Sequence, residues 1–233
     1  MKCLKLQIFQ ESACYKKPFA FKVAETYPLP PYSTVKGFIH SLLNANEFID
    51  MAISIQGTYE SIFENYTTFY SMKRDGKITT FPLRVLQLYN VELVIHIATH
   101  EDIMNTALQA LWSSEETLTL GRAEDVAVLK SAKLVNVQEV PVENLEPEML
   151  FLKRNFYIPK SYKVVENGVL LRIPYRYDVI NEIRTWTELV DVYYVQRDTP
   201  ISSGKVYVDS ENDLVFFHKL PDAFELGVNK RGE

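Results

Sequence analysis

The amino-acid sequence predicts an α+β fold in which two helices accompany several mainly antiparallel strands, and three observations lead to this prediction. Residues 1–10 alternate between apolar and other side chains, as a half-buried strand does. Residues 34–44 carry apolar side chains at helical spacing, directly behind a proline-rich segment. Residues 86–97 form a second long alternating strand, which a second helix at residues 101–111 follows.

The remaining segments of the first part complete a βαββαβ order. Residues 51–55 alternate as a strand, and the aromatic segment 59–70 is either strand or irregular. Further strands are expected at residues 118–122 and 126–138. This order is that of the ferredoxin-like fold, which RNA-recognition domains also use. It predicts an antiparallel sheet with both helices on one face and a free opposite face, but no function by itself.

An acidic, proline-flanked segment at residues 141–147 predicts a domain boundary. Residues 1–140 would then form the ferredoxin-like domain, and residues 141–233 a small β-rich C-terminal domain. In the second part, strands flank Asn167 and Gly168, and an Asn-Gly pair favours a tight hairpin. Later strands are expected at residues 189–196, 205–208 and 213–218.

Charge and composition exclude some classes of function. With 25 Lys and Arg against 30 Asp and Glu, the net charge of −5 argues against nucleic-acid binding through overall charge. Basic residues nevertheless gather in residues 15–36, 72–84 and 153–176. Each cluster alone is equally well explained as an ordinary solvated surface or as part of a binding site. Three clusters of the same sign favour one basic track.

Motif searches find no cofactor or metal signature. The two cysteines and four histidines do not fall at metal-binding spacings, so neither a metal nor a cofactor is expected. P-loop, dinucleotide-binding and G-x-S-x-G motifs do not occur, which leaves nucleotide-triphosphate and hydrolase chemistry without support. The N-terminal residues are typical of a strand and not of a signal peptide, and no apolar run is long enough to span a membrane. We therefore expect a cytoplasmic protein without membrane contact.

The most informative segment is residues 27–40, where a proline-stiffened loop runs directly into the first helix. Its prolines disfavour helix before Ser33, and Ser33 or Thr34 is expected to cap the first turn. Exposed N–H groups at a helix start, with Lys36 nearby, favour binding of an anion such as a nucleic-acid phosphate.

The same helix offers a catalytic alternative. His40 shares a helix face with Lys36 and follows Tyr32. These side chains would suit movement of a 2′-hydroxyl proton and stabilisation of a phosphate, as in a metal-independent ribonuclease. The other interpretation is that His40 only contacts RNA or a partner protein.

A second candidate binding element is the turn at Gly121 and Arg122. Glycine permits positive φ or close approach of another backbone, and arginine can fork onto phosphate or stack on a base. An equally good interpretation is a plain turn in which Arg122 pairs with Glu124 or Asp125.

Two motifs resemble those of a known family. The string T-Y-P-L-P-P-Y-S-T-V-K-G at residues 26–37, and L-G-R at residues 120–122 before acidic residues, resemble the CRISPR-associated protein five family. This family belongs to the RAMP superfamily, and the proline-rich string is most similar to its type I-B branch. The resemblance implies an RNA-binding subunit of the type I Cascade surveillance complex, a ribonucleoprotein of antiviral defence, that caps the crRNA 5′ handle. It also implies contacts with the first backbone subunit and the large subunit, target DNA near the PAM, and a β-hairpin thumb within residues 59–90.

The resemblance and the basic clusters together give a set of candidate RNA-binding residues. They are Lys16, Lys17, Lys22, Ser33, Lys36, His40, Lys73, Arg74, Lys77, Gly121, Arg122, Lys153 and Arg154. No catalytic residue is assigned, because the type I-C branch that cleaves RNA uses adjacent Lys and His, and this chain has only the reversed pair at 218–219. An endoribonuclease using His40, Lys36 and Tyr32, and a scaffold for acidic protein faces, are the alternatives.

Overall fold

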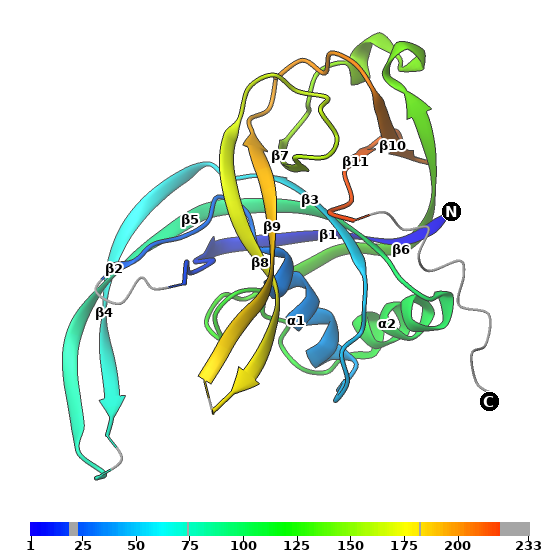
Figure 1. The fold of residues 1–233 in the computed structure, drawn as a ribbon. Coiled ribbons are helices and arrows are strands. Elements are labelled where there is room, and N and C mark those ends of the chain that lie inside the picture. The colour runs from blue at the N-terminus through cyan, green and yellow to red at the C-terminus, as the bar shows by residue number, and fades with distance from the viewer. Residues whose placement is uncertain (19–22, 74, 182, 220–233) are drawn as a thin grey trace.

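The structure is a computed structural model that describes residues 1–18, 23–73, 75–181 and 183–219 (Figure 1). Its helices are α1 (Tyr32–Leu42) and α2 (Glu101–Ser113), with short 3-10 turns at Val142–Asn144 and Pro147–Met149. The strands are β1 (Lys2–Ala13), β2 (Val23–Ala24), β3 (Ala52–Thr58), β4 (Ser61–Met72), β5 (Ile78–Ala98), β6 (Val128–Pro141), β7 (Asn155–Pro159), β8 (Val169–Ile180), β9 (Ile183–Val195), β10 (Lys205–Asp209) and β11 (Leu214–Val215). Within the described ranges, neither helix is long and apolar enough to cross a membrane.

The strands form one mainly antiparallel sheet of 11 strands, as an α+β fold with few helices predicts. Its main path runs β11-β10-β6-β1-β5-β3-β7-β9-β8, and β2 and β4 pair with β5 off this path. The short strand β2 is parallel to β5, while the other pairs in the described chain are antiparallel.

The main core lies between the sheet and the two helices, which cover the same face (Figure 1). Leu4 and Leu6 of β1 belong to the same buried cluster as Val35 of α1 and Met104 and Leu111 of α2. Each such side chain contributes roughly 1.5–3 kcal/mol through burial. The alternation of residues 1–10 and the helical spacing of α1 therefore place the expected apolar residues in this core.

The opposite face is also covered, so the prediction of a free sheet face is wrong there. Lys5 of β1 is only 1% exposed, and its Nζ lies 2.6 Å from both Asp209 Oδ2 and Asp213 Oδ2. His96 Nε2 of β5 lies 3.0 Å from Asp209 Oδ2. Residues 209–218 cross this face and supply its counter-charges, because buried charges are stable only when paired.

The strands that follow Pro141 extend the sheet at both ends. β7, β9 and β8 continue it beyond β3, and β10 and β11 continue it beyond β6. The described strands on both sides of Pro141 share one sheet. The division into domains at residues 1–140 and 141–233 stays a prediction.

The predicted hairpin across Asn167 and Gly168 is wrong. The two strands that flank Asn167 and Gly168 do not pair with each other: β7 pairs with β3 and β9, and β8 pairs with β9. Gly168 has a different use, because a Cβ there would lie 2.9 Å from the Tyr193 Cβ of β9. The glycine therefore permits close approach of two chain segments. The predicted strand at residues 118–122 is reduced to one bridge, Thr119 with Val126.

A long hairpin projects from the body of the protein (Figure 1). It pairs β4 with the first half of β5, from Ser61 opposite Tyr89 to Met72 opposite Ile78. Gly76 in its turn has φ +78°, in agreement with the Asp-Gly turn expected there. The aromatic segment 59–70 is thus largely strand, and Tyr66 and Met72 within the hairpin are 68% and 79% exposed.

Candidate nucleic-acid interface

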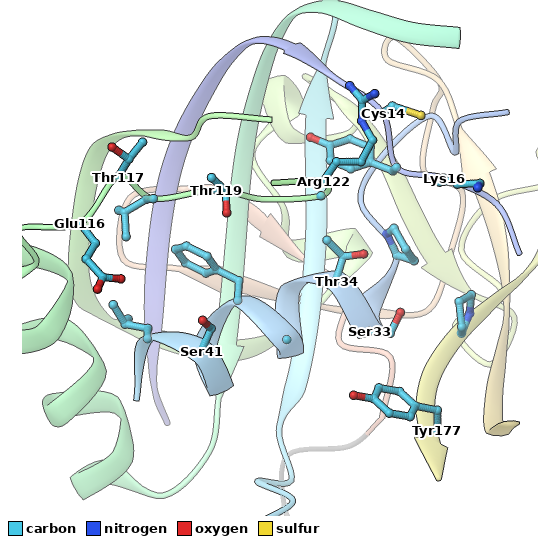
Figure 2. Close-up of a pocket in the computed structure, with 18 of the residues that line it drawn as sticks. Cys14, Lys16, Ser33, Thr34, Ser41, Glu116, Thr117, Thr119, Arg122 and Tyr177 are labelled. Carbon is cyan, nitrogen blue, oxygen red and sulfur yellow. The ribbon is translucent and has the colours of Figure 1, made fainter. Parts of the chain in front are cut away.

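A groove with a volume of about 940 Å³ runs beside the first turns of α1 (Figure 2). The groove is lined by the segment that follows β1, by α1, by the loop after α2 and by the β8–β9 hairpin. Its lining side chains include Lys16, Lys17, Pro31, Ser33, Thr34, Ser41, Glu115, Glu116, Thr119, Gly121, Arg122, Pro174, Tyr177 and Trp186.

The start of α1 forms the floor of this groove. Pro31 precedes the helix in an extended conformation, with φ −67° and ψ 155°, and no side chain caps the first turn. The prediction that Ser33 or Thr34 is the cap is wrong, because the helix begins at Tyr32, two residues before the predicted start at residue 34. The Pro31 carbonyl accepts from the Thr34 N–H at 2.9 Å, so the first donors, at Tyr32 and Ser33, have no partner within the helix.

The loop around Arg122 closes one side of the groove. Arg122 Nη2 lies 2.6 Å from Asp125 Oδ1, and its Nε donates to Oδ2 at 3.1 Å. Burial alone would lower the pKa of Arg122, but the bonds to Asp125 outweigh burial and raise it. Gly121 has φ +118°, and a Cβ there would lie 2.7 Å from Asp125 Oδ2. Of the two interpretations of this segment, the paired turn is the one observed.

Lys36 does not lie where the sequence places it. The residue is 5% exposed, and its Nζ lies 4.6 Å from the ring centroid of Phe48 and 5.0 Å from that of Tyr175. Burial lowers the pKa of Lys36, and nearby Arg176 lowers it further. Lys36 is therefore not a partner of the helix N–H groups in the groove, because its side chain packs into an aromatic cage of Phe48, Tyr175 and Tyr177.

The side chains of the catalytic alternative do not meet in the groove. Tyr32 is fully buried, and its ring stacks on His218 with centroids 4.5 Å apart. His40 is half-buried, and its Nε2 accepts the Ile49 N–H at 3.2 Å. Burial lowers the pKa of His40. Tyr32, Lys36 and His40 are not among the residues that line the groove.

Two of the predicted lysines lie at the mouth of the groove. Lys16 is exposed, and Lys17 forms a 3.1 Å ion pair with Glu25 across the adjoining strand segment. With Ser33, Gly121 and Arg122, they are the predicted residues that the structure brings together.

The other predicted basic residues do not line the groove. Lys73 and Lys77 are exposed near the tip of the β4–β5 hairpin, and Lys153 is exposed after the second 3-10 turn. Arg154 Nη1 pairs with Asp213 at 2.9 Å. Lys22 and Arg74 lie outside the described residues.

Sequence reasoning missed one wall of the groove, which the β8–β9 hairpin supplies. Tyr177 and Trp186 line the groove from this hairpin, and Figure 2 shows Tyr177 together with Ser33 of α1, which lines the same groove. The available signal was their aromatic character in two neighbouring strand segments, but only the register places them opposite each other. The described part of the chain contains no group of acidic, histidine and cysteine side chains suited to a metal ion.

Comparison with known proteins agrees with the fold. The family model described as CRISPR-associated protein (Cas_Cas5) matches residues 3–182. No curated protein matches the sequence. Among solved structures, a chain of a CRISPR RNA-guided surveillance complex is similar with a TM-score of 0.55 and 11% identity, over 85% of this chain and 91% of that chain.

A second solved structure, a CRISPR protein from Archaeoglobus fulgidus, is similar with a TM-score of 0.50. Its identity is also 11%, over 92% of this chain and 98% of that chain. Such low identities show a shared fold alone, whereas the family model covers most of the chain. This protein therefore belongs to the Cas5 family of CRISPR-associated proteins.

Proposed function

We propose that this chain is the non-catalytic subunit of a type I CRISPR surveillance complex that binds the 5′ handle of the crRNA. The observation that carries the proposal is the groove at α1, where residues from three separate segments meet: Lys16 and Lys17, Ser33, and Gly121 with Arg122. Family membership supports the same function.

The groove has the features that an RNA backbone needs. The N–H groups at the start of α1 that have no partner within the helix, and the two lysines, attract phosphates. Arg122 contributes by holding the loop in place through Asp125, with its guanidinium at the groove wall. Because the attraction is local, it is compatible with the overall net charge of −5.

The projecting β4–β5 hairpin supports a role in a larger assembly. It corresponds to the thumb of the family, and its exposed apolar side chains are suited to a protein partner such as the first backbone subunit. The strand order β6-β1-β5-β3, with α1 and α2 between consecutive strands, supports a ferredoxin-like centre. In this proposal the large subunit and the PAM side of the target DNA lie nearby, in a type I-B-like complex.

A binding role without catalysis is favoured by the positions of three side chains. Tyr32 and Lys36 are buried, and the ring nitrogen Nε2 of His40 is engaged by a backbone N–H. A general base must reach the proton that it removes, and these side chains do not line the groove. Incubation of the purified chain with repeat RNA in EDTA tests this part, since clean cleavage that His40→Ala abolishes would contradict it.

The binding proposal is tested by isolating the complex with its crRNA and mapping which end of the RNA the chain protects. We expect protection of the 5′ handle that is lost in Lys16→Gln/Lys17→Gln and kept in Lys205→Gln, a control at an exposed lysine of β10. Protection of another segment, or a complex that contains no RNA, would overturn the proposal.

A further inference from the structure

We propose that Tyr177 and Trp186 form a stacking surface for one unpaired nucleobase at the hairpin end of the groove. The inference rests on the proposed function, namely that the groove holds RNA. The inference adds contact with a base to the contacts with phosphates in that site. The two residues that make it lie outside the motifs at residues 26–37 and 120–122.

The two rings form one unit on the β8–β9 hairpin. Tyr177 and Trp186 are directly opposite each other in the strand register, and their ring centroids lie 5.6 Å apart at an interplanar angle of 82°. Register shifts on both sides of Arg176 interrupt regular pairing just before this position. Such irregularities re-aim side chains, and here both rings line the groove.

The pair remains accessible to a flat ligand. Both residues are half-buried, and in their edge-to-face contact the edge of one ring meets the face of the other. The indole N–H of Trp186 forms no hydrogen bond to a described residue. Lys36 Nζ lies 6.0 Å from the Tyr177 ring centroid.

The surroundings favour a nucleobase over an apolar peptide. Tyr177 lines the same groove as Ser33 at the start of α1 (Figure 2), where helix N–H groups attract a phosphate. Lys16 and Lys17 line the same groove. Aromatic rings next to phosphate-binding groups are typical of sites for single-stranded nucleic acid, in which bases unstack from each other and stack on the protein.

Tryptophan fluorescence tests the inference directly, because the chain has two tryptophans. Trp112 is 61% exposed on α2 and does not line the groove, so Trp112→Phe leaves Trp186 as the reporter. Titration of this full-length variant with a short oligoadenylate RNA is expected to quench the fluorescence. The same RNA carrying a single abasic site at each position in turn is expected to lose the quench at one position.

Affinity measurements complete the test. Trp186→Ala is expected to weaken binding of the oligoadenylate by about 5- to 100-fold with an unchanged salt dependence, and Trp186→Phe is expected to restore most of the affinity. Val179→Ala, at an exposed residue of the same hairpin, is the matched control and is expected to bind normally.

The outcomes separate the two proposals. Normal RNA affinity without quenching, or with no weakening in Trp186→Ala, would overturn the stacking surface and leave the proposed function standing. Absence of any salt-dependent RNA binding would overturn both. If Trp186→Ala fails to fold, the quenching titration and Trp186→Phe still decide the question.

Discussion

Arg122 and Asp125 form a two-point ion pair, with Nη2 to Oδ1 at 2.6 Å and Nε to Oδ2 at 3.1 Å, at the wall of the groove. Asp125 is only 1% exposed, and its Oδ2 also accepts the backbone N–H groups of Arg122 and Cys14. One carboxylate thus ties the end of β1 to the glycine-arginine turn. The turn is rigid before any ligand arrives, which lowers the entropy cost of binding.

Removal of Arg122 is predicted to destabilise the protein. Arg122→Ala leaves the buried Asp125 carboxylate without its cationic partner, so we expect the free energy of unfolding to fall by about 1–3 kcal/mol. Urea denaturation measures this change. Glu124→Ala, which removes the exposed partner of Arg122, is the control and should change stability by less than about 0.5 kcal/mol.

The two lysines at the groove mouth are predicted to set the salt dependence of RNA binding. In Lys16→Gln/Lys17→Gln, the slope of log affinity against log salt concentration should become shallower by about one for each phosphate that the variant no longer neutralises. Lys17 already pairs with Glu25, so its contribution should be the smaller one. Binding isotherms at several salt concentrations measure the slope, and an unchanged slope would remove these lysines from the site.

Lys36 is predicted to be dispensable for RNA binding. Lys36→Met keeps the length of the side chain and its packing against Phe48 and Tyr175, while it removes a charge that lies outside the groove lining. We expect the affinity for RNA and its salt slope to stay unchanged. A slope reduced by about one would show that the ammonium reaches a phosphate after all.

His218 is predicted to make stability depend on pH. Burial lowers its pKa from 6.5 to about 3, and Nδ1 accepts the Ile53 N–H at 3.0 Å. The unfolded chain therefore binds a proton below about pH 6.5 that the folded chain refuses until about pH 3. Stability present above this window should be lost as pH falls through it, by about 1.4 kcal/mol per pH unit for this group.

Urea denaturation of the wild type and His218→Asn across this pH window checks the prediction. Asparagine can accept the same backbone N–H but does not titrate, so the variant should show the shallower slope. Buried His96 also has a lowered pKa and remains in both proteins, which makes the difference between the slopes the decisive quantity. Equal slopes would contradict the assignment.

The β4–β5 hairpin is predicted to contribute to assembly and little to stability. Tyr66 and Tyr70 lie on one face of β4 and are 68% and 64% exposed. Tyr66→Asp/Tyr70→Asp should change the free energy of unfolding by less than about 0.5 kcal/mol per site. It should weaken association with the partner subunit by about tenfold or more, measured by size-exclusion chromatography or calorimetry.

Val169→Asp, at a 60% exposed position of edge strand β8, is the matched control for this hairpin. Normal assembly of the tyrosine variant, or equally weakened assembly of the control, would show that the hairpin face does not contact the partner.

Local sequence patterns were sufficient for most elements of the first part. Alternation identified β1 and the second half of β5, and helical spacing identified α1 and α2 to within a few residues. Glycine chemistry was informative where the constraint is local, as in the Asp-Gly turn at Gly76. It misled at Gly168, where the constraint is the approach of β9.

The candidate site was predictable only in part, for a similar reason. Ser33, Gly121 and Arg122 lie in segments with marked local chemistry, and they do meet in the groove. Tyr177 and Trp186 have no local signal that separates a groove wall from a core position. Their opposition follows from strand register, which a single sequence does not display.

The sequence by itself determined both helices and most strands of the first part, with the apolar face of each, because those properties depend on neighbours a few residues apart. Only the tertiary structure decided which charges reach a ligand. Lys5 and Asp209 pair across 204 positions of the chain, and the cage around Lys36 comes largely from β8. Burial of a charge depends on such distant partners, so the side chains of Lys16 and Lys36, alike in the sequence, have opposite environments in the fold.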